Sequence, residues 1–355
     1  MRLGVTATLG TLRDRVEPQG VVLPIDKGHL SLGWLTDLYT DGFRADNGGM
    51  STPSGLSGES RSVDVAGTRV HYRFAGADGP VVLIHGWPTT CELWREQIPL
   101  LAQHHRVYAL DLPGFGGSAR PAGLYSFGLL AQVVVGFLDC LGLDRVSLVG
   151  HDLGGPIALL VALRHPARVD RLVVLNTTPY PKLPSMVRPL LFVARNRMLS
   201  KLLTTRLTFR LLFRIGTAKR RGIADDLAER YFGPLRDDQE ARRALRAVLA
   251  DTDPSELSAI EHGAADLTCP VLVLWGDKDP TAPMGIAQRL VDDIPSAALI
   301  TIPGAGHFVP EDDPLAVADH LSRFLATQRR NPDIRDNPEN ENNEPPGSNA
   351  DAERE

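Results

Sequence analysis

An aspartate set among small residues is the clearest candidate for chemistry in this chain. Asp152 lies in the segment 150–155, between an apolar run and a segment with a helical pattern. A sharp turn from strand to helix holds the residue at its apex in a strained conformation, and glycines on either side leave room for it. Backbone N–H groups at the start of a helix favour an anion. The sequence therefore predicts a carboxylate held out over the end of a sheet.

Two further groups follow later apolar runs. Asp279 comes after the predicted strand 271–275, and His307 comes after the predicted strand 298–302 and a glycine-rich turn. Asp277 lies two residues before Asp279 and competes with it for the same role. Two acids and a histidine at the ends of three different strands are able to act as nucleophile, orienting carboxylate and base.

An aspartate nucleophile suits a different reaction from a serine nucleophile. Carboxylates, with a typical pKa of about 4, are ionised at pH 7, so no base is needed to activate them. They suit displacement at a saturated carbon that bears a good leaving group, such as a halide or a strained epoxide oxygen. The product would be an alkyl ester of Asp152. His307 would then take a proton from the water that attacks this ester, while Asp279 orients His307.

The elements that must position these groups alternate between strands and helices. The predicted strands are a hairpin at 62–65 and 69–74, followed by 81–84, 106–111, 146–149, 171–175, 271–275 and 298–302. From 176 to 262 the pattern is helical, which indicates an insertion at the carboxyl end of the sheet, where doubly wound folds bind ligands. We therefore expect an α/β fold with a mostly parallel, doubly wound sheet and a helical lid inserted after the sixth strand.

The chain divides into five predicted segments. These are a poorly ordered N-terminal extension (1–59), the first part of the core (60–175), the lid (176–262), the second part of the core (263–327) and a disordered acidic tail (328–355). Residues 1–49 lack the positive start and apolar block of a signal peptide. We expect the protein to start at Met50, or to carry residues 1–49 as a loosely attached extension.

The composition limits the classes of partner and cofactor. The chain has 355 residues and a net charge of −5, which gives no reason to expect nucleic-acid binding. Its three cysteines are scattered and odd in number, which argues against a disulfide framework and fits a reducing, cytoplasmic location. The histidines lack the spacing of metal ligands, so we expect neither a metal nor a cofactor. We expect a monomer or homodimer whose partners are a small hydrophobic substrate and water.

Four motifs together resemble the α/β-hydrolase superfamily. They are the oxyanion-loop motif 85–88, the following loop 111–118, the segment 150–155 and the segment 176–179 that leads into the lid. The chain order of nucleophile, acid and histidine is also that of the family. The segment 150–155 resembles the branch with an aspartate nucleophile, which holds epoxide hydrolases and haloalkane or haloacid dehalogenases.

This resemblance implies a set of functional residues. The implied catalytic triad is Asp152, Asp279 and His307. The implied oxyanion hole is formed by the backbone N–H groups of Trp87 and Leu153. The residues His85 and Gly86 belong to the supporting loop. The family spacing favours Asp279 over Asp277 as the acid. We assign no role to His151, which matches no motif.

The two branches place different demands on the pocket. Haloalkane dehalogenases usually carry tryptophan directly after the nucleophile, where this chain has Leu153. They often carry asparagine where this chain has Trp87. Epoxide hydrolases need lid tyrosines, for which Tyr180 and Tyr231 are the candidates. We favour hydrolysis of a small hydrophobic electrophile through a covalent aspartyl ester, most like an epoxide hydrolase. The alternatives are a haloalkane or haloacid dehalogenase, and a hydrolase-fold protein that binds an apolar ligand without converting it.

The lid contains a basic stretch. Residues 182–221 hold eleven Lys or Arg and no acid. On a helix, one face would carry Arg206, Arg210 and Arg214, and another would carry Leu199, Leu203, Leu207 and Leu211. This pattern fits a membrane surface. It also fits a lid helix that packs its leucines over the pocket and leaves its charges in water; we favour this interpretation and expect no membrane contact.

Overall fold

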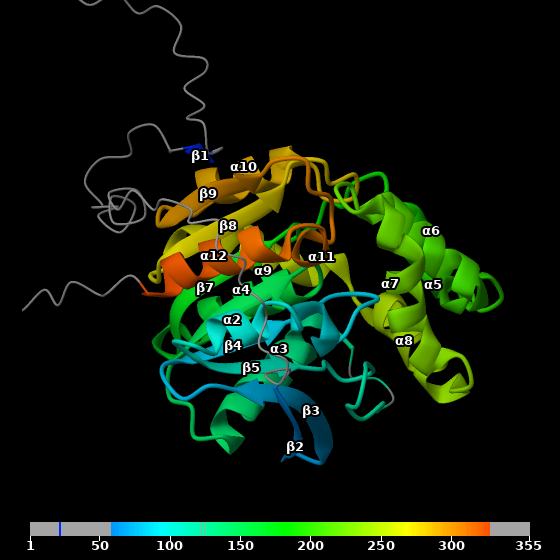
Figure 1. Ribbon diagram of the computed structural model, residues 1–355, viewed down its shortest axis with the longest axis horizontal. Coiled ribbons are helices and arrows are strands. Elements are labelled where there is room, and N and C mark those ends of the chain that lie inside the picture. The colour runs from blue at the N-terminus through cyan, green and yellow to red at the C-terminus, as the bar shows by residue number, and fades with distance from the viewer. Residues whose placement is uncertain (1–20, 23–57, 122, 124, 327–355) are drawn as a thin grey trace, which may run out of the picture.

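A nine-stranded sheet forms the centre of the molecule (Figure 1). The computed structural model describes residues 21–22, 58–121, 123 and 125–326. The strands are β1 (Val21–Val22), β2 (Glu59–Val65), β3 (Thr68–Ala75), β4 (Pro80–Ile84), β5 (Arg106–Leu110), β6 (Val146–His151), β7 (Val169–Leu175), β8 (Val271–Gly276) and β9 (Ala297–Ile302). Their spatial order is β1-β9-β8-β7-β6-β4-β5-β3-β2. Strands β4 to β9 pair in parallel, whereas β1, β2 and β3 join the sheet in antiparallel pairs.

This topology confirms the predicted fold class. The expected hairpin is β2–β3, and the parallel strands follow it with helices between them. Counted from β2, strand β7 is the sixth, and the helical insertion follows it as predicted. The predictions for the tail 328–355 and for most of residues 1–59, Met50 included, concern residues outside the described part of the chain.

Helices cover both faces of the sheet. One face carries α3 (Phe127–Cys140), α4 (Gly154–Arg164) and α10 (Met284–Asp293), and the other carries α2 (Ile98–Leu101), α11 (Val309–Asp312) and α12 (Pro314–Ala326). Because both faces are covered, every residue of β6 and of β8 is buried. Ser126 caps α3 by accepting a hydrogen bond from the N–H of Leu129 at 3.2 Å. This packing leaves the carboxyl ends of the strands as the edge at which the loops meet.

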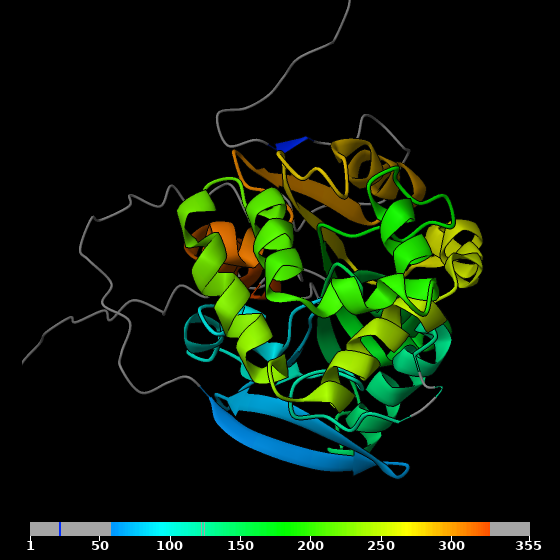
Figure 2. The same cartoon turned by 90° about the vertical axis from the view of Figure 1, so that its right-hand side faces the viewer.

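The lid is a separate layer of helices over this edge. Between β7 and β8 the described chain forms α5 (Val187–Arg195), α6 (Arg206–Gly216), α7 (Ala224–Phe232), α8 (Gln239–Asp251) and α9 (Ser258–Gly263), joined by turns and short 3₁₀ helices. Figure 1 shows α5 to α8 to the right of the sheet, and Figure 2 shows this side of the molecule face on. Helix α5 packs on α8 and α6 packs on α7, whereas α9 packs on α4 of the core. None of the described helices has the length and apolar character needed to cross a membrane.

Candidate active site

The turn after β6 holds Asp152 in a left-handed backbone conformation, with a φ of +50°. Such a φ is uncommon for a residue with a Cβ, so the surrounding structure must hold it. A Cβ at Gly150 would lie 2.3 Å from the carbonyl oxygen of Gly154, and a Cβ at Gly155 would lie 2.4 Å from the hydroxyl of Thr177. The glycines therefore allow β6 and α4 to meet at the sharp turn that the sequence predicts.

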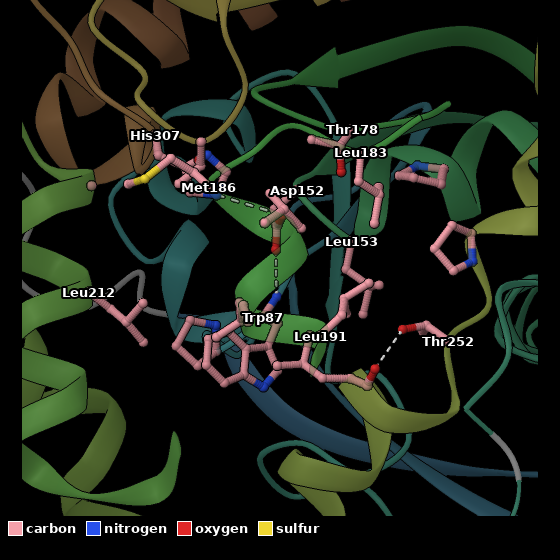
Figure 3. Close-up of a pocket in the computed structure, with 18 of the residues that line it drawn as sticks. Trp87, Asp152, Leu153, Thr178, Leu183, Met186, Leu191, Leu212, Thr252 and His307 are labelled. Carbon is pink, nitrogen blue, oxygen red and sulfur yellow. Dashed lines mark hydrogen bonds and ion pairs between the residues drawn. The ribbon is translucent and has the colours of Figure 1, made fainter. Parts of the chain in front are cut away.

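The loop after β4 holds one oxygen of the Asp152 carboxylate. The backbone N–H of Trp87 donates a hydrogen bond to its Oδ2 at 2.9 Å (Figure 3). His85 braces this loop, because its Nδ1–H donates to the carbonyl oxygen of Gly86 at 2.9 Å while its Nε2 accepts from the N–H of Leu112 at 3.0 Å. Burial lowers the pKa of His85, which favours the neutral ring that this arrangement requires.

The histidine and the second acid lie beside Asp152. Nδ1 of His307 is 2.8 Å from Oδ2 of Asp279, and Nε2 of His307 is 3.6 Å from Oδ1 of Asp152. Asp279 is fixed from several sides, since its Oδ1 also accepts from the N–H and hydroxyl of Thr281 and its Oδ2 accepts from the amide of Asn176 at 2.7 Å. The carboxylate of Asp277 instead accepts from the N–H of Gly304 and pairs with Lys278. Of the two candidate acids, the structure brings Asp279 to the histidine.

The pKa values of His307 and Asp279 are shifted in opposite directions, because their charges stabilise each other. Burial lowers the pKa of His307, but the carboxylates of Asp279 and Asp152 outweigh burial and raise it to about 10. Burial raises the pKa of Asp279, but His307 and the hydrogen bonds to Ala282 and Asn176 outweigh burial and lower it to about 2. At neutral pH the site therefore holds an imidazolium between two carboxylates.

This pairing predicts a stability that depends on pH. The pKa of His307 is about 10 in the folded state against a usual value of 6.5, so its contribution is complete below pH 6.5 and disappears as the pH rises through 10. We expect the free energy of unfolding to fall by a few kcal/mol, on the order implied by the pKa shift, between neutral pH and pH 10. His307→Gln should lack this part of the fall. Urea unfolding of the unaltered protein and of the variant across this pH range measures the difference. If the free energy of unfolding fell equally with pH in both proteins, the prediction would be wrong.

Three polar residues to which the sequence analysis gave no individual role support the site. His151, buried at the end of β6, lies with Nε2 2.9 Å from the carbonyl oxygen of His307. Asn176 follows β7 and bridges Asp279 to the N–H of Gly276. The hydroxyl of Thr177 donates to the carbonyl oxygen of Asp152 at 2.6 Å. Asn176 and Thr177 could have been found as buried polar residues at a strand end, whereas no local signal marks His151.

The lid also holds the histidine loop. The carbonyl oxygen of Gly216, the last residue of α6, accepts hydrogen bonds from the N–H of His307 at 2.7 Å and from the N–H of Phe308 at 3.2 Å. A Cβ at Gly216 would lie 2.5 Å from the ring of Phe308. Glycine at this position therefore lets α6 rest directly on the loop that carries His307.

A cavity of about 180 Å³ opens in front of Asp152. In Figure 3, Asp152 lies between Trp87 and His307, and lid side chains such as Met186, Leu191 and Leu212 surround the space. Leu153, at the start of α4, lines it as well. Apart from Asp152 and His307, the polar side chains of the lining are Thr178, Thr252, Thr281 and Trp87. The lining is thus mainly apolar, as is typical of a site for a small hydrophobic ligand.

The structure places both candidate lid tyrosines outside this cavity. The hydroxyl of Tyr231 donates to Oε1 of Glu311 at 2.7 Å, and Glu311 also forms a two-point ion pair with Arg95. The hydroxyl of Tyr180 donates to Asp293 at 2.8 Å, beneath the guanidinium of Arg289. Both hydroxyls are engaged in contacts away from the cavity, so the structure does not bring these two candidates to Asp152. The sequence could not show this, because the partners lie on distant elements.

One group of side chains has the composition of a metal site. His71, Cys91 and Asp111 have their ligand atoms within 4.8 Å of one another, the only such group among the described residues. Asp111 accepts from the Nδ1–H of His71 and from the N–H groups of Cys91 and Gly117. Burial raises the pKa of the Cys91 thiol. The group therefore ties β3, the start of the helix after β4 and the loop after β5 together through the carboxylate of Asp111.

Comparisons with known proteins agree with this architecture. A family model described as "alpha/beta hydrolase fold" matches residues 79–314. Haloalkane dehalogenase 2 of Mycobacterium tuberculosis is 34% identical over 272 residues, which cover 73% of this chain and 92% of that protein. The uncharacterized hydrolase YugF of Bacillus subtilis is 29% identical and covers 75% of this chain and 97% of its own length.

A solved structure has the same fold. The epoxide hydrolase CorEH superposes with a TM-score of 0.68 and 25% identity, covering 76% of this chain and 98% of that one. The family match spans most of the described core, including the segments that carry Trp87, Asp152, Asp279 and His307. The chain therefore belongs to the α/β-hydrolase fold family, in which epoxide hydrolases and haloalkane dehalogenases are among its relatives.

Proposed function

We propose that this protein hydrolyses small apolar electrophiles, epoxides first among them, through a covalent ester on Asp152. One observation carries the proposal: the two oxygens of Asp152 have different surroundings. Oδ2 accepts the N–H of Trp87, whereas Oδ1 lies 3.6 Å from Nε2 of His307, beyond hydrogen-bond distance. One oxygen is thus held in place and the other is left to react.

In the first step, Oδ1 of Asp152 attacks an epoxide carbon. A C–O bond forms to the carboxylate as the epoxide C–O bond breaks, and the released oxygen takes up a proton from a water molecule to become a hydroxyl group. The hydroxide left behind is neutralised by the proton that His307 gives up as its pKa falls. The ester that results is neutral. Because the charge of Asp152 is lost, one of the two causes of the raised His307 pKa is removed, and the pKa of the ring falls.

In the second step, His307 acts as the base. Once deprotonated, Nε2 accepts a proton from a water molecule, and the water oxygen attacks the ester carbonyl carbon of Asp152. The negative charge of the tetrahedral intermediate develops on Oδ2, where the N–H of Trp87 already points. Asp279 holds the ring and stabilises its charged form. As the intermediate collapses, the bond between its central carbon and Oδ1 breaks, and the leaving oxygen takes the proton that remains on the added hydroxyl group. The diol is released and the carboxylate is restored.

The two candidate leaving groups differ in what they need from the protein, because both candidate tyrosines lie outside the cavity but a released epoxide oxygen can still take its proton from water. A departing halide needs N–H donors, but the indole N–H of Trp87 donates to the carbonyl oxygen of Leu245 at 3.1 Å, and the residue after the nucleophile is Leu153. Dehalogenation is the second candidate, favoured by the 34% identity to a haloalkane dehalogenase. The two candidates share the ester and differ only in the group that departs.

Single-turnover hydrolysis in water enriched in oxygen-18 tests the proposal. Enzyme in excess would be mixed with an aromatic epoxide or a 1-haloalkane, and product and protein analysed by mass spectrometry. Through an ester, the oxygen added to the first product comes from Asp152, and the heavy oxygen enters the protein. Heavy oxygen in the first product would show direct attack by water and overturn the proposal.

Replacing Gly86 should disturb the nucleophile. A Cβ at this position would lie 2.5 Å from Oδ2 of Asp152. We expect Gly86→Ala to lower kcat/KM by roughly a hundredfold, since small misplacements of reacting groups have effects of this size. Gly285→Ala is the matched control, because a Cβ there meets nothing within 4 Å. Equal kinetics of the two variants would argue against Asp152 as the reacting group.

Removing the hydroxyl of Tyr231 should affect stability rather than chemistry. Because this hydroxyl donates to Glu311 and lies outside the cavity, we expect Tyr231→Phe to change kcat/KM by less than about threefold and to lower the free energy of unfolding by roughly 1–2 kcal/mol. Kinetics with an epoxide and urea unfolding measure the two effects. A large loss confined to epoxide substrates would instead make Tyr231 the acid that protonates the opening ring.

A further inference from the structure

The leucines of α6 do not pack over the pocket as expected. Helix α6 buries Phe209 and Phe213, whereas Leu207 and Leu211 are 73% and 54% exposed. Of the nine large exposed hydrophobic residues among the described ones, eight lie on the lid: Met186, Phe192, Met198, Leu199, Leu202, Leu207, Leu211 and Ile215. We call these eight the apolar lid surface. Exposed apolar groups gathered in this way mark a surface that contacts another molecule or a membrane.

The apolar lid surface is continuous with the pocket. Leu207, Leu211 and Ile215 recur at intervals of four residues and so form one stripe along α6. The stripe ends at Ile215, which lines the cavity, and Met186 before α5 also lines it while remaining half exposed. An apolar path therefore leads from the outside of the lid, between α5 and α6, to Asp152.

Cations border this surface. One hollow beside Phe192 is lined by Lys182, Arg188 and Arg195, and a second is lined by Lys201, Arg242, Arg243 and Arg246 with Glu240 as its acid. Arg206 and Arg210 pair with Glu229 and Asp225. Lys182, Arg188, Arg197 and Lys201 form no salt bridge within the described chain. The lid thus carries local positive charge on a protein whose net charge is −5.

The charge decides between two occupants of the apolar lid surface. A second copy of the chain would bring two cationic surfaces together across a twofold axis, and like charges in contact are unfavourable. An anionic bilayer offers negative headgroups to the Lys and Arg side chains and hydrocarbon to the leucines. The bilayer therefore matches both features of the surface.

We infer that the lid docks on the surface of an anionic phospholipid bilayer. Leu207, Leu211 and Phe192 enter the acyl-chain boundary, and the cations of the two hollows contact headgroup phosphates. The pocket mouth between α5 and α6 then faces the hydrocarbon, so apolar substrates reach the cavity from the membrane. Docking is independent of the proposed chemistry, and the inactive variant Asp152→Ala should dock as well as the unaltered protein.

Vesicle sedimentation of the full chain tests this inference. We expect binding to vesicles of phosphatidylglycerol and phosphatidylcholine in equal parts, and much weaker binding to phosphatidylcholine alone. Leu207→Ser with Leu211→Ser should lower the partition coefficient by about tenfold or more, since insertion of each leucine is lost. Arg197→Glu with Lys201→Glu should lower it by at least about twentyfold. The matched controls are Leu315→Ser on α12, where the residue is 63% exposed, and Arg69→Glu on β3.

The outcomes separate docking from its rivals. Neither leucine lines the cavity, so the double leucine variant should keep its melting temperature and its turnover of soluble substrates. Absence of sedimentation, or equal sedimentation with both kinds of vesicle, would overturn the inference. A dimer in size-exclusion chromatography that the double leucine variant dissociates, without vesicle binding, would assign the surface to a second copy instead.

Discussion

Replacement of His307 by glutamine is expected to convert the enzyme into a stable covalent ester. In the proposed mechanism the first step needs only Oδ1 of Asp152, whereas the second needs a base at the position of Nε2, which lies 3.6 Å from that oxygen. Losing a general base costs up to about 10⁴-fold in rate, so we expect steady-state turnover to fall by roughly 10³-fold or more. Intact-protein mass spectrometry after incubation with an aromatic epoxide, and separately with a 1-haloalkane, should show the adduct.

The mass of the adduct identifies the reaction. An epoxide adds its whole mass to the protein, whereas a haloalkane adds its alkyl group alone. Asp152→Ala combined with His307→Gln is the control and should show no adduct from either reagent. Normal turnover without an adduct would remove His307 from the mechanism, and a complete lack of adducts would point to a protein that binds apolar ligands without converting them.

Replacement of Asp279 by asparagine is expected to have the next largest effect. Asp279 accepts the Nδ1–H of His307 and supplies the first of the charges that raise the pKa of this ring to about 10. With asparagine, the ring loses its orienting acceptor and the stabilisation of its charged form, so we expect turnover to fall by about 10³-fold. The defect should lie in hydrolysis of the ester, so a burst of ester formation should precede slow turnover in stopped-flow measurements.

Asp277→Asn is the matched control for this experiment. Both acids lie on the loop after β8, but Asp277 accepts from the N–H of Gly304 and does not contact His307. We expect it to keep turnover within about threefold, with a small loss of stability from the weakened turn. If the two variants were equally impaired, the loop as a whole rather than its contact with His307 would matter.

Local motifs made the fold and the sharp turn at Asp152 predictable. The glycines around Asp152 are needed because backbone atoms approach within the reach of a Cβ, and that requirement is visible in the sequence as small residues at fixed positions. Strands β6 and β8 are buried along their whole length, so their sequences are short apolar runs of the kind that is typical of parallel strands. Asp279 could be separated from Asp277 through the family spacing, and the structure shows the contact behind it.

The environment of the pocket was not predictable in this way. The indole of Trp87 finds its acceptor at Leu245, 158 positions along the chain, and the hydroxyl of Tyr231 finds Glu311, 80 positions away. Such pairings depend on how the lid lies on the core, which no local pattern determines. The leucines of α6 illustrate the same limit, because an amphipathic pattern shows that a helix has two faces without showing which face meets solvent.

The hydrogen bonds from the histidine loop to Gly216 restrict how this enzyme exchanges its contents. If α6 moved away as a rigid body, His307 and Phe308 would lose the acceptor of their backbone N–H groups, and the loop that positions His307 would lose these contacts as substrate enters. We expect passage to rely instead on rotation of side chains such as Met186 and Ile215, which line the cavity, while the helices stay in place. A disulfide engineered to join α6 to the core should therefore leave turnover intact. Access to the cavity would then be controlled by the rotation of side chains and not by displacement of a whole helix.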